Sequence, residues 1–441
     1  MTRRKHPDSD LRIAYRRLDE LRENPANARL HPEKQLAQFA RSIESFGFNV
    51  PVLIDASGML LAGHGRLTAA RRVGLESIPT IRVDHLSEAQ RRAFVLAENG
   101  RWDEEKLAIE LEAILELETS FEITDTGFEI GEVDHLIEEL HKPEREDEEE
   151  PVFDPDRVDQ VCRRGDLWLM GRHRLFCGDA LDPLSYSVLM GDERAAMAFT
   201  DAPYNLKIPG VVSGLGKVMH SDFVEASGEM SREEFVAFLT QAMRCMREAS
   251  SDGSLHFHFM DWRQVRQLIE AGEAVYDELK GLVVWDKGSG GMGSLYRGQH
   301  ELIGVFKAGK GSHVNNVKLG AHGRNRSNVW RYAGMSSFGK GRAEKLAWHP
   351  TVKPVALVGD AILDCSNPGD LVLDPFAGSG TTAIAAERTR RRAALIELDP
   401  QFCDVILRRF CDATGIEPAN AWTGEIVARK PLSEGEDSHA G

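Results

Sequence analysis

The feature that most constrains the fold of this chain is an apolar segment that ends in an acid and leads into a glycine-rich turn. Leu371–Asp374 is apolar up to its last residue, and Gly378 and Gly380 follow just before a helix predicted to begin at Thr381. Because glycine has no Cβ, such a turn lets the backbone reverse sharply and approach a ligand closely. A strand, a glycine-rich turn and a helix in this order are typical of a parallel sheet covered by helices.

An acid at the end of the next predicted strand indicates that the ligand is a nucleoside. Glu397 closes the strand predicted at Ala393–Glu397 and lies nineteen residues after Gly378. In sheets of this kind, an acid at this place accepts hydrogen bonds from ribose hydroxyls.

Three nucleoside cofactors compete for this turn. ATP would require a Gly-Lys-Ser/Thr ending, whereas Gly380 is followed by Thr381, so a Walker A loop is disfavoured. A dinucleotide is formally permitted by Gly378-x-Gly380-x-x-Ala383, which keeps an NAD-binding oxidoreductase open as an alternative. S-adenosylmethionine is favoured, because the carboxylate of Asp374 would attract its positive charges and repel a pyrophosphate.

Apolar segments alternate with helical patterns from about residue 160 onward. This alternation predicts an α/β fold with a mostly parallel sheet and helices on both faces. Besides the two strands above, we expect strands at Trp168–Met170, Ala196–Thr200, Ser254–Phe259, Leu279–Trp285 and Glu301–Lys307.

The N-terminal part predicts a separate, smaller α/β unit. Apolar positions from Leu36 to Phe46 share one helical face, short strands are expected at Val50–Asp55 and Met59–Ala62, and helices at Arg66–Val73 and from Ser87 onward. We therefore expect an α/β domain at 11–100, a helical extension at 101–142, an acidic linker at 143–158, a main domain at 159–425 and a disordered tail at 426–441.

Charge is unevenly distributed along the chain. The net charge of −16 argues mildly against a nucleic-acid partner, but Glu129–Glu150 has eleven acids against two bases, and Lys307–Lys345 has nine bases against one acid. The overall sum therefore hides a basic segment that suits phosphate groups. We see no membrane span, no secretory signal and no metal or disulfide pattern among the six cysteines, so we expect a cytoplasmic protein that needs no metal.

The chemistry is carried by Asp201-Ala202-Pro203-Tyr204, which follows a predicted strand. An exocyclic amine of a base is a poor nucleophile, because its lone pair is delocalised into the ring. A carboxylate and a backbone carbonyl that accept its two N–H protons would localise this lone pair, and an aromatic ring offers a face for a base taken out of the helix. The segment resembles the [Asp/Asn/Ser]-Pro-Pro-[Tyr/Phe/Trp] motif of the β-group amino-methyltransferases that act on DNA. Ala202 replaces the first proline, so we expect a looser loop but an active enzyme.

Other segments resemble elements of the same family, and the likeness covers roughly residues 160–412. His349-Pro-Thr-Val-Lys353-Pro354 is similar to an element that helps to enclose the methionine part of the cofactor. Leu282–Lys287, with Tyr296-Arg297 and His300-Glu301, is similar to the segment that lines the target-base pocket.

The order of the motifs also fits the β group, in which the catalytic motif precedes the glycine-rich turn by circular permutation. The resemblance implies a Rossmann-like, S-adenosylmethionine-dependent methyltransferase fold with seven strands and places Asp179 near the cofactor adenine. It implies catalytic roles for Asp201, Pro203 and Tyr204, and cofactor contacts from Asp179, Lys353, Asp374, Phe376, Gly378, Ser379, Gly380, Thr381, Thr382 and Glu397.

Adenine N6 is the expected target, because aspartate at the first motif position leans towards adenine in this family. Cytosine N4 stays open as an alternative. Cytosine C5 is disfavoured, since that chemistry needs a Pro-Cys nucleophile and none of the six cysteines follows a proline. The expected partner is double-stranded DNA, with RNA as an alternative, in a restriction–modification or orphan setting. In the family, the interval 307–347 houses target recognition, and the candidate DNA contacts are Lys318, Arg324, Arg326 and Arg331.

The N-terminal unit resembles the domain shared by ParB partition proteins and sulfiredoxin, through Leu61–Gly74 and the following Ile78-Pro79. In that family the corresponding region binds nucleotide phosphates, which makes Gly63, His64 and Arg66 candidates for binding CTP or ATP at a helix N-terminus. Sulfiredoxin chemistry is disfavoured, because the first cysteine is Cys162. Alternatively, the motif only shapes a turn and the domain aids DNA contact or dimerisation, which leaves a homodimer open as the assembly. The rival interpretation of the whole chain is a nucleotide-gated DNA-binding module with a degenerate methyltransferase domain.

Overall fold

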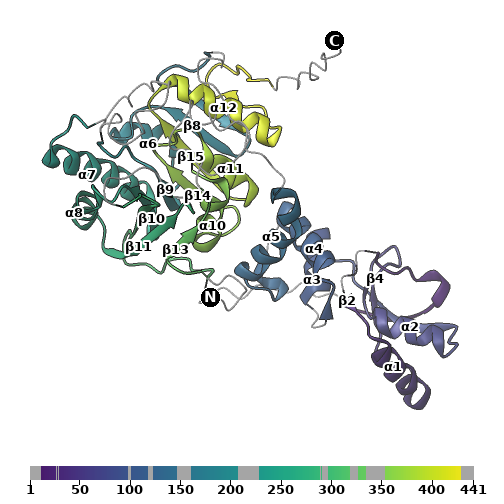
Figure 1. Cartoon of the computed structure of the whole chain (residues 1–441). Coiled ribbons are helices and arrows are strands. Elements are labelled where there is room, and N and C mark those ends of the chain that lie inside the picture. Colours follow the sequence, from purple (N-terminus) through teal and green to yellow (C-terminus); the bar gives the residue numbers. More distant parts are fainter. Residues whose placement is uncertain are drawn as a thin grey trace, which may run out of the picture. The chain divides into compact units, whose positions relative to one another are not determined.

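The computed structural model describes residues 11–25, 27, 29–97, 101–117, 123–146, 160–206, 228–288, 290, 296–317, 326–333 and 353–428. The chain divides into two compact units, Met1–Glu148 and Glu149–Gly441 (Figure 1). This division falls inside the predicted linker at 143–158, of which residues 147–158 lie outside the described part.

The N-terminal unit contains a four-stranded sheet in the order β1-β5-β3-β4. Only β3 and β5 run parallel, while β1 and β4 pair antiparallel with their neighbours. Helix α2 begins directly after β4 at Gly63, whose φ of 101° is the left-handed conformation that glycine adopts without strain. The elements are β1 (Ile13–Arg17), β2 (Arg29–Leu30), α1 (Glu33–Phe46), β3 (Val52–Ile54), β4 (Leu60–Ala62), α2 (His64–Arg72), β5 (Ser77–Arg82) and β6 (Arg101–Trp102).

A small helical core follows within the same unit and consists of α3 (Glu88–Ala97), α4 (Glu104–Glu116) and α5 (Ile130–Glu146). The Asp103 side chain caps α4 by accepting from the Lys106 amide. Helix α5 continues to Glu146, past the predicted end of the helical extension at residue 142.

The C-terminal unit is built on a ten-stranded sheet in the order β13-β11-β12-β10-β9-β14-β15-β8-β7-β16. All the strands predicted here are present, with ends shifted by at most a few residues. The strands are β7 (Leu167–Met170), β8 (His173–Cys177), β9 (Ala195–Thr200), β10 (Ser250–Met260), β11 (Glu278–Asp286), β12 (His300–Lys307), β13 (Val329–Arg331), β14 (Leu371–Asp374), β15 (Arg392–Glu397) and β16 (Ala419–Asn420).

Helices cover both faces of this sheet (Figure 1). One face packs against α6 (Pro183–Met190), α7 (Arg232–Glu248) and α8 (Val265–Val275), and the other against α10 (Val355–Cys365), α11 (Thr381–Arg388) and α12 (Pro400–Thr414). This is the predicted Rossmann-like layering, although the described sheet has ten strands where seven were expected.

The directions of the strands determine which residues meet at one edge. Strands β10, β9, β14, β15 and β8 are mutually parallel, so their carboxyl ends lie together. Strand β12 is antiparallel to both β10 and β11, and therefore the start of β12 and the end of β11 reach the same edge. We call it the carboxyl edge. Ligands of open α/β sheets bind at this edge.

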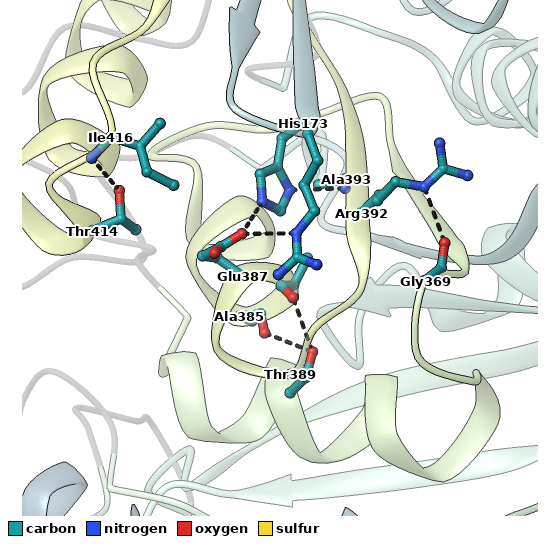
Figure 2. Close-up of polar contacts among 11 residues, drawn as sticks. His173, Gly369, Ala385, Glu387, Thr389, Arg392, Ala393, Thr414 and Ile416 are labelled. Carbon is teal, nitrogen blue, oxygen red and sulfur yellow. Dashed lines mark hydrogen bonds and ion pairs between the residues drawn. The ribbon is translucent and has the colours of Figure 1, made fainter. Parts of the chain in front are cut away.

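A buried histidine fixes the opposite edge of the sheet (Figure 2). The ring of His173 is fully buried at the start of β8; its Nδ1 accepts the N–H of Ala393 at 2.9 Å, and its Nε2 donates to Glu387 at 2.7 Å. The bond from His173, helped by Arg172 and opposed by burial, lowers the pKa of Glu387 to about 2. These bonds tie β8 to β15 and α11, which makes the frame behind the carboxyl edge rigid. Strand β8 was not predicted.

A second buried network joins two histidines on β10. His256 Nδ1 lies 2.9 Å and His258 Nε2 3.1 Å from the hydroxyl of Tyr276, and Ser254 Oγ lies 3.1 Å from His256 Nε2. Burial lowers the pKa of His258 to about 3 and that of His256 well below its ordinary value, so both rings are neutral in the folded protein.

We expect this network to reduce stability at acid pH. Between pH 6.5 and 3 the unfolded chain protonates His258 and the native state does not, so the free energy of unfolding falls as the pH drops. Between pH 6.5 and 5 this histidine should account for about 2 kcal/mol. Urea unfolding of wild type and His258→Gln at both pH values measures the difference in the free energy of unfolding between the two proteins. A difference that does not change with pH would contradict the prediction.

The described chain extends slightly beyond the predicted main domain. Ile426 forms a bridge with Ala419, and the amide of Val427 donates to Pro418. Residues 426–428 are therefore part of the described fold, and the rest of the predicted tail, residues 429–441, lies outside the described part. Within the described residues, no helix combines the length and apolar character of a membrane span, and no group of ligating side chains fits a metal ion.

Candidate active site

Four charged side chains from distant parts of the sequence form one cluster at the carboxyl edge. Asp201 follows β9, Glu301 is the second residue of β12, Lys287 follows β11 and Lys353 precedes α10. Lys353 Nζ lies 2.6 Å from Asp201 Oδ2 and 3.2 Å from Glu301 Oε2, and Lys287 Nζ lies 2.5 Å from Glu301 Oε1. Two cations and two carboxylates thus alternate in one network.

This cluster is largely shielded from solvent. The side chain of Lys353 is 7% exposed, that of Glu301 12% and that of Asp201 23%. Burial works against the charged form of Glu301, but Lys353 and Lys287 outweigh it and lower its pKa to about 2. Burial raises the pKa of Asp201, and the Lys353 ammonium opposes this rise. Asp201 is therefore the more basic carboxylate of the two.

Tyr204 is oriented by the same carboxylates. Its hydroxyl donates to Asp201 Oδ1 at 2.6 Å and lies 3.1 Å from Glu301 Oε2. Burial and the two carboxylates raise its pKa well above the ordinary value, so the hydroxyl keeps its proton. Lys353 lies 4.9 Å from the ring centre of Phe259 and 5.8 Å from that of Trp285, which form an aromatic floor under the cluster.

The glycine-rich turn lies beside this cluster, on the neighbouring strand β14. Strands β9 and β14 are adjacent and parallel, with Ala198 opposite Leu373, so Asp374 and Asp201 both stand where these strands end. Asp374 Oδ2 accepts from Thr382 Oγ1 at 2.6 Å, and Oδ1 accepts from the Phe376 amide at 3.2 Å.

Packing fixes the shape of the turn. Gly380 has a φ of 79°, and a Cβ added there would lie 2.8 Å from Ile406; both facts require glycine. Arg409 on α12 donates to the carbonyl of Ser379 at 3.0 Å and to Thr381 Oγ1 at 2.9 Å. The turn is therefore held from outside by α12.

Two more acids stand at the ends of the next strands along the edge. Glu397 at the end of β15 accepts from the Gly378 amide at 2.9 Å and from the Asp399 amide at 3.1 Å. Asp179, after β8, is half-buried and accepts from the Leu181 amide at 2.8 Å. Asp374, Glu397 and Asp179 thus line three consecutive strand ends.

Comparison with known proteins identifies both parts of the chain. Residues 195–408 match the model of a DNA methylase family that covers N6 and N4 amino-methyltransferases. Residues 4–100 match the ParB N-terminal domain, and residues 105–164 match the helix-turn-helix domain of ParB-methyltransferases. YnaK of Escherichia coli K12, a ParB-like nuclease domain-containing protein, is 44% identical over 82 residues, which are 19% of this chain and 94% of YnaK.

The chain combines a ParB-like N-terminal domain with an N6/N4 amino-methyltransferase domain.

The relatives of the methyltransferase domain match over shorter stretches. The DNA adenine methyltransferase YhdJ of Escherichia coli K12 is 42% identical over 81 residues, 18% of this chain and 26% of YhdJ. The solved structure of the cytosine-N4-specific PvuII DNA methyltransferase has 17% identity and a TM-score of 0.41, covering 55% of this chain and 92% of that one. The chain therefore spans only a quarter of the length of YhdJ.

The acids at these strand ends suit S-adenosylmethionine, the cofactor predicted from the sequence. Burial raises the pKa of both Asp374 and Glu397 to about 7. Among the described residues, no lysine or arginine forms an ion pair with either carboxylate. Buried acids of this kind suit a ligand that brings a positive charge and ribose hydroxyls, as this cofactor does.

The structure changes the interpretation of Lys353. The resemblance implied that the segment around it encloses the methionine part of the cofactor, whereas its ammonium lies on Asp201 and Glu301. The start of that segment, including His349, lies outside the described residues. The other predicted residues, from Asp201, Pro203 and Tyr204 to the glycine-rich turn, share the carboxyl edge.

The contacts of Arg326 argue against its predicted contact with DNA. Its guanidinium pairs with Asp360 and Asp364 of α10 and lies 5.1 Å from the ring centre of Trp330, and its side chain is only 18% exposed. Arg331, by contrast, is 84% exposed at the end of β13 and stays a candidate. The other two candidates, Lys318 and Arg324, lie outside the described residues.

In the ParB-like domain, the structure separates the three candidate nucleotide-binding residues. His64 is 7% exposed, and its Nε2 accepts the Asn24 amide at 3.4 Å. This imidazole is buried and accepts a backbone amide, which argues against its predicted role as an anion ligand. Gly63 and Arg66 remain at the start of α2, and a Cβ on Gly63 would lie 2.7 Å from Val52.

Sequence reasoning overlooked three residues that hold the site. Glu301 and Lys287 were placed only in a segment resembling the base pocket, and nothing in the sequence linked them to Lys353. Arg409 carries no sequence signal at all, because it lies 28 residues from Thr381 on a different helix. The helix-turn-helix region was predicted only as a helical extension.

Proposed function

We propose that the protein transfers a methyl group from S-adenosylmethionine to adenine N6 in double-stranded DNA. The observation that carries this proposal is the position of Asp201 and Asp374 at the ends of two adjacent parallel strands. Neighbouring strands are about 4.8 Å apart, so an amine acceptor and a cofactor turn stand side by side. The family match to DNA methylases supports the reaction type.

The residues have distinct roles in this step. Asp201 uses one oxygen for Lys353 and the other for Tyr204, and each oxygen has a further lone pair that can accept an amine N–H. The adjacent carbonyl of the motif would accept the second N–H, as in the family. Both bonds direct the lone pair of the amine away from the base ring. Bound cofactor supplies the methyl group on a positively charged sulfur, and Asp201 can take the proton that the amine loses.

The remaining residues preorganise this geometry. Lys353 neutralises Asp201 in the free enzyme, so that the carboxylate is held in place before DNA arrives. Glu301 and Lys287 complete the network and balance its charge. The ring of Tyr204, held by its hydroxyl, is the surface on which the extruded base would stack.

Cofactor affinity should rise with pH. A cationic ligand favours the ionised form of Asp374, whose pKa is about 7 in the free protein, so binding releases a proton below that pH. We expect affinity to increase about tenfold between pH 6 and pH 8 for one such carboxylate. Calorimetry in two buffers of different ionisation enthalpy measures both the affinity and the proton release. An affinity that is constant or decreases over this range would refute the role of Asp374.

Adenine is preferred over cytosine because aspartate occupies position 201, and YhdJ is an adenine methyltransferase. The ParB-like and helix-turn-helix matches support DNA rather than RNA as the partner. The test is to express the protein in a host that lacks its own DNA methylation and to sequence that DNA with modification-sensitive reads. N6-methyladenine at a recurring site supports the proposal. If the reads show N4-methylcytosine instead, the target base is cytosine and not adenine. Unmodified DNA would refute the activity.

A further inference from the structure

A tryptophan on the carboxyl edge is exposed although its backbone is well anchored. Trp262 follows β10 and is 57% exposed. Residues 261–264 form the turn between β10 and α8, and Asp261 orders this turn by accepting the Arg263 amide at 2.9 Å. A large apolar ring presented by a rigid turn is typical of a contact surface rather than of a flexible loop.

The same turn is bound to the catalytic segment. Gln264 donates from Nε2 to the carbonyl of Asn205 at 3.3 Å, and Asn205 directly follows Tyr204. Asn205 is itself 8% exposed and accepts the amides of Gly228 and Met230 at 3.0 and 3.2 Å. Trp262 is therefore held on the same support as the catalytic motif.

The neighbour of the tryptophan supplies a cation. The guanidinium of Arg263 lies 5.7 Å from the centre of the Trp262 ring and 3.3 Å from Asp261 Oδ1. Its side chain is 40% exposed, so it can still reach an anion. The ring and the guanidinium together present an aromatic surface and a positive charge at one point.

Other exposed residues at this edge have the same character. Strand β12 begins beside the end of β10, because Met260 pairs with Leu302. The connection before β12 presents Tyr296, which is 84% exposed, and Arg297, which is also exposed. Arg331 at the end of β13 is 84% exposed. On a chain with a net charge of −16, aromatic and cationic groups gather where Asp201 lies, and this combination fits nucleic acid.

We propose that Trp262 and Arg263 form a DNA-contacting wedge beside the catalytic motif. The indole stacks on a base next to the extruded one, and the guanidinium neutralises a phosphate of the same strand. This inference rests on the proposed function, since it takes the partner to be the DNA substrate. It assigns a contact outside the interval 307–347, where target recognition was predicted, and outside the ParB-like domain.

The test uses the full-length protein and dye-labelled duplex DNA prepared from a methylation-free plasmid. Trp262→Ala should weaken binding about tenfold, and Trp262→Phe should restore most of it, because the aromatic face remains. Arg263→Ala should reduce the steepness with which the logarithm of the DNA-binding constant falls with the logarithm of the salt concentration, by about one, which corresponds to the loss of one phosphate contact. The affinity for S-adenosylmethionine and the thermal unfolding temperature should stay unchanged, which excludes misfolding as the cause.

A matched control is available on the same sheet. Trp422 is also exposed, at 61%, but it follows β16, which lies six strand positions from β10 in the sheet. At about 4.8 Å per strand, β16 and β10 are roughly 29 Å apart. Trp422→Ala should bind DNA as wild type does. Equal affinities for wild type and Trp262→Ala, an equal loss in Trp422→Ala, or a change in self-association without a loss of DNA binding would each overturn the wedge.

The experiment distinguishes a failure of the wedge from a failure of the proposed function. If the wild-type protein methylates and binds DNA but Trp262→Ala does so equally well, only the wedge is overturned. If the wild-type protein neither binds nor methylates DNA, the proposed function and the wedge are overturned together.

Discussion

Replacing Asp201 by Asn is expected to reduce methyl transfer on the order of a thousandfold or more, while the affinity for S-adenosylmethionine changes little. The amide keeps the size of the side chain but loses the charge, and its NH2 group cannot accept an amine proton. Lys353 would then pair with Glu301 alone. Transfer of labelled methyl groups to methylation-free DNA measures the rate, and calorimetry measures cofactor binding.

A surface substitution provides the control for Asp201. Asp192 is an exposed carboxylate in the turn between α6 and β9, at the edge opposite the site. Asp192→Asn removes the same charge and should leave both the rate and the affinity unchanged. An Asp201→Asn variant that keeps a tenth of the wild-type rate would rule out the assigned role, as would a variant that loses cofactor binding and catalysis in parallel.

Replacing Asp374 by Asn is the second change with a large expected effect, and it acts on binding instead. Loss of a buried charged acceptor should weaken cofactor binding about 10- to 100-fold at pH 8. Because the pKa of Asp374 is about 7, the wild-type side chain is mostly neutral at pH 6 and then resembles asparagine. The difference between wild type and variant should therefore shrink as the pH falls.

The fold and the cofactor turn could be predicted from the sequence because their signals are local. Strand β14 was predicted with both ends as observed, since Leu371–Asp374 is a continuous apolar run closed by an acid and glycines. Strand β8 was missed, because its first two residues are His173 and Arg174 and nothing local marks them as buried. The bonds that bury His173 come from Glu387 and Ala393, more than two hundred residues away.

The site was predicted in part for the same reason. The motif at Asp201 and the turn at Asp374 are short, self-contained patterns that can be found without knowing that β9 and β14 are neighbours. The partner of Asp201 was not predictable from spacing, because Lys353 lies 152 positions later in the chain. The ion pairs of Arg326 were not predictable either, because composition alone cannot distinguish a cation that faces DNA from one that pairs with acids on α10.

The most direct test is the crystal structure of the protein bound to S-adenosylhomocysteine and a duplex that carries its methylation site. We predict that the ligand lies along the turn at 374–382, that its sulfur faces the Asp201 carboxylate, and that the extruded adenine presents its amine to this carboxylate. A ligand seated elsewhere in the protein, or an amine that contacts neither Asp201 nor the adjacent carbonyl, would contradict the proposed chemistry.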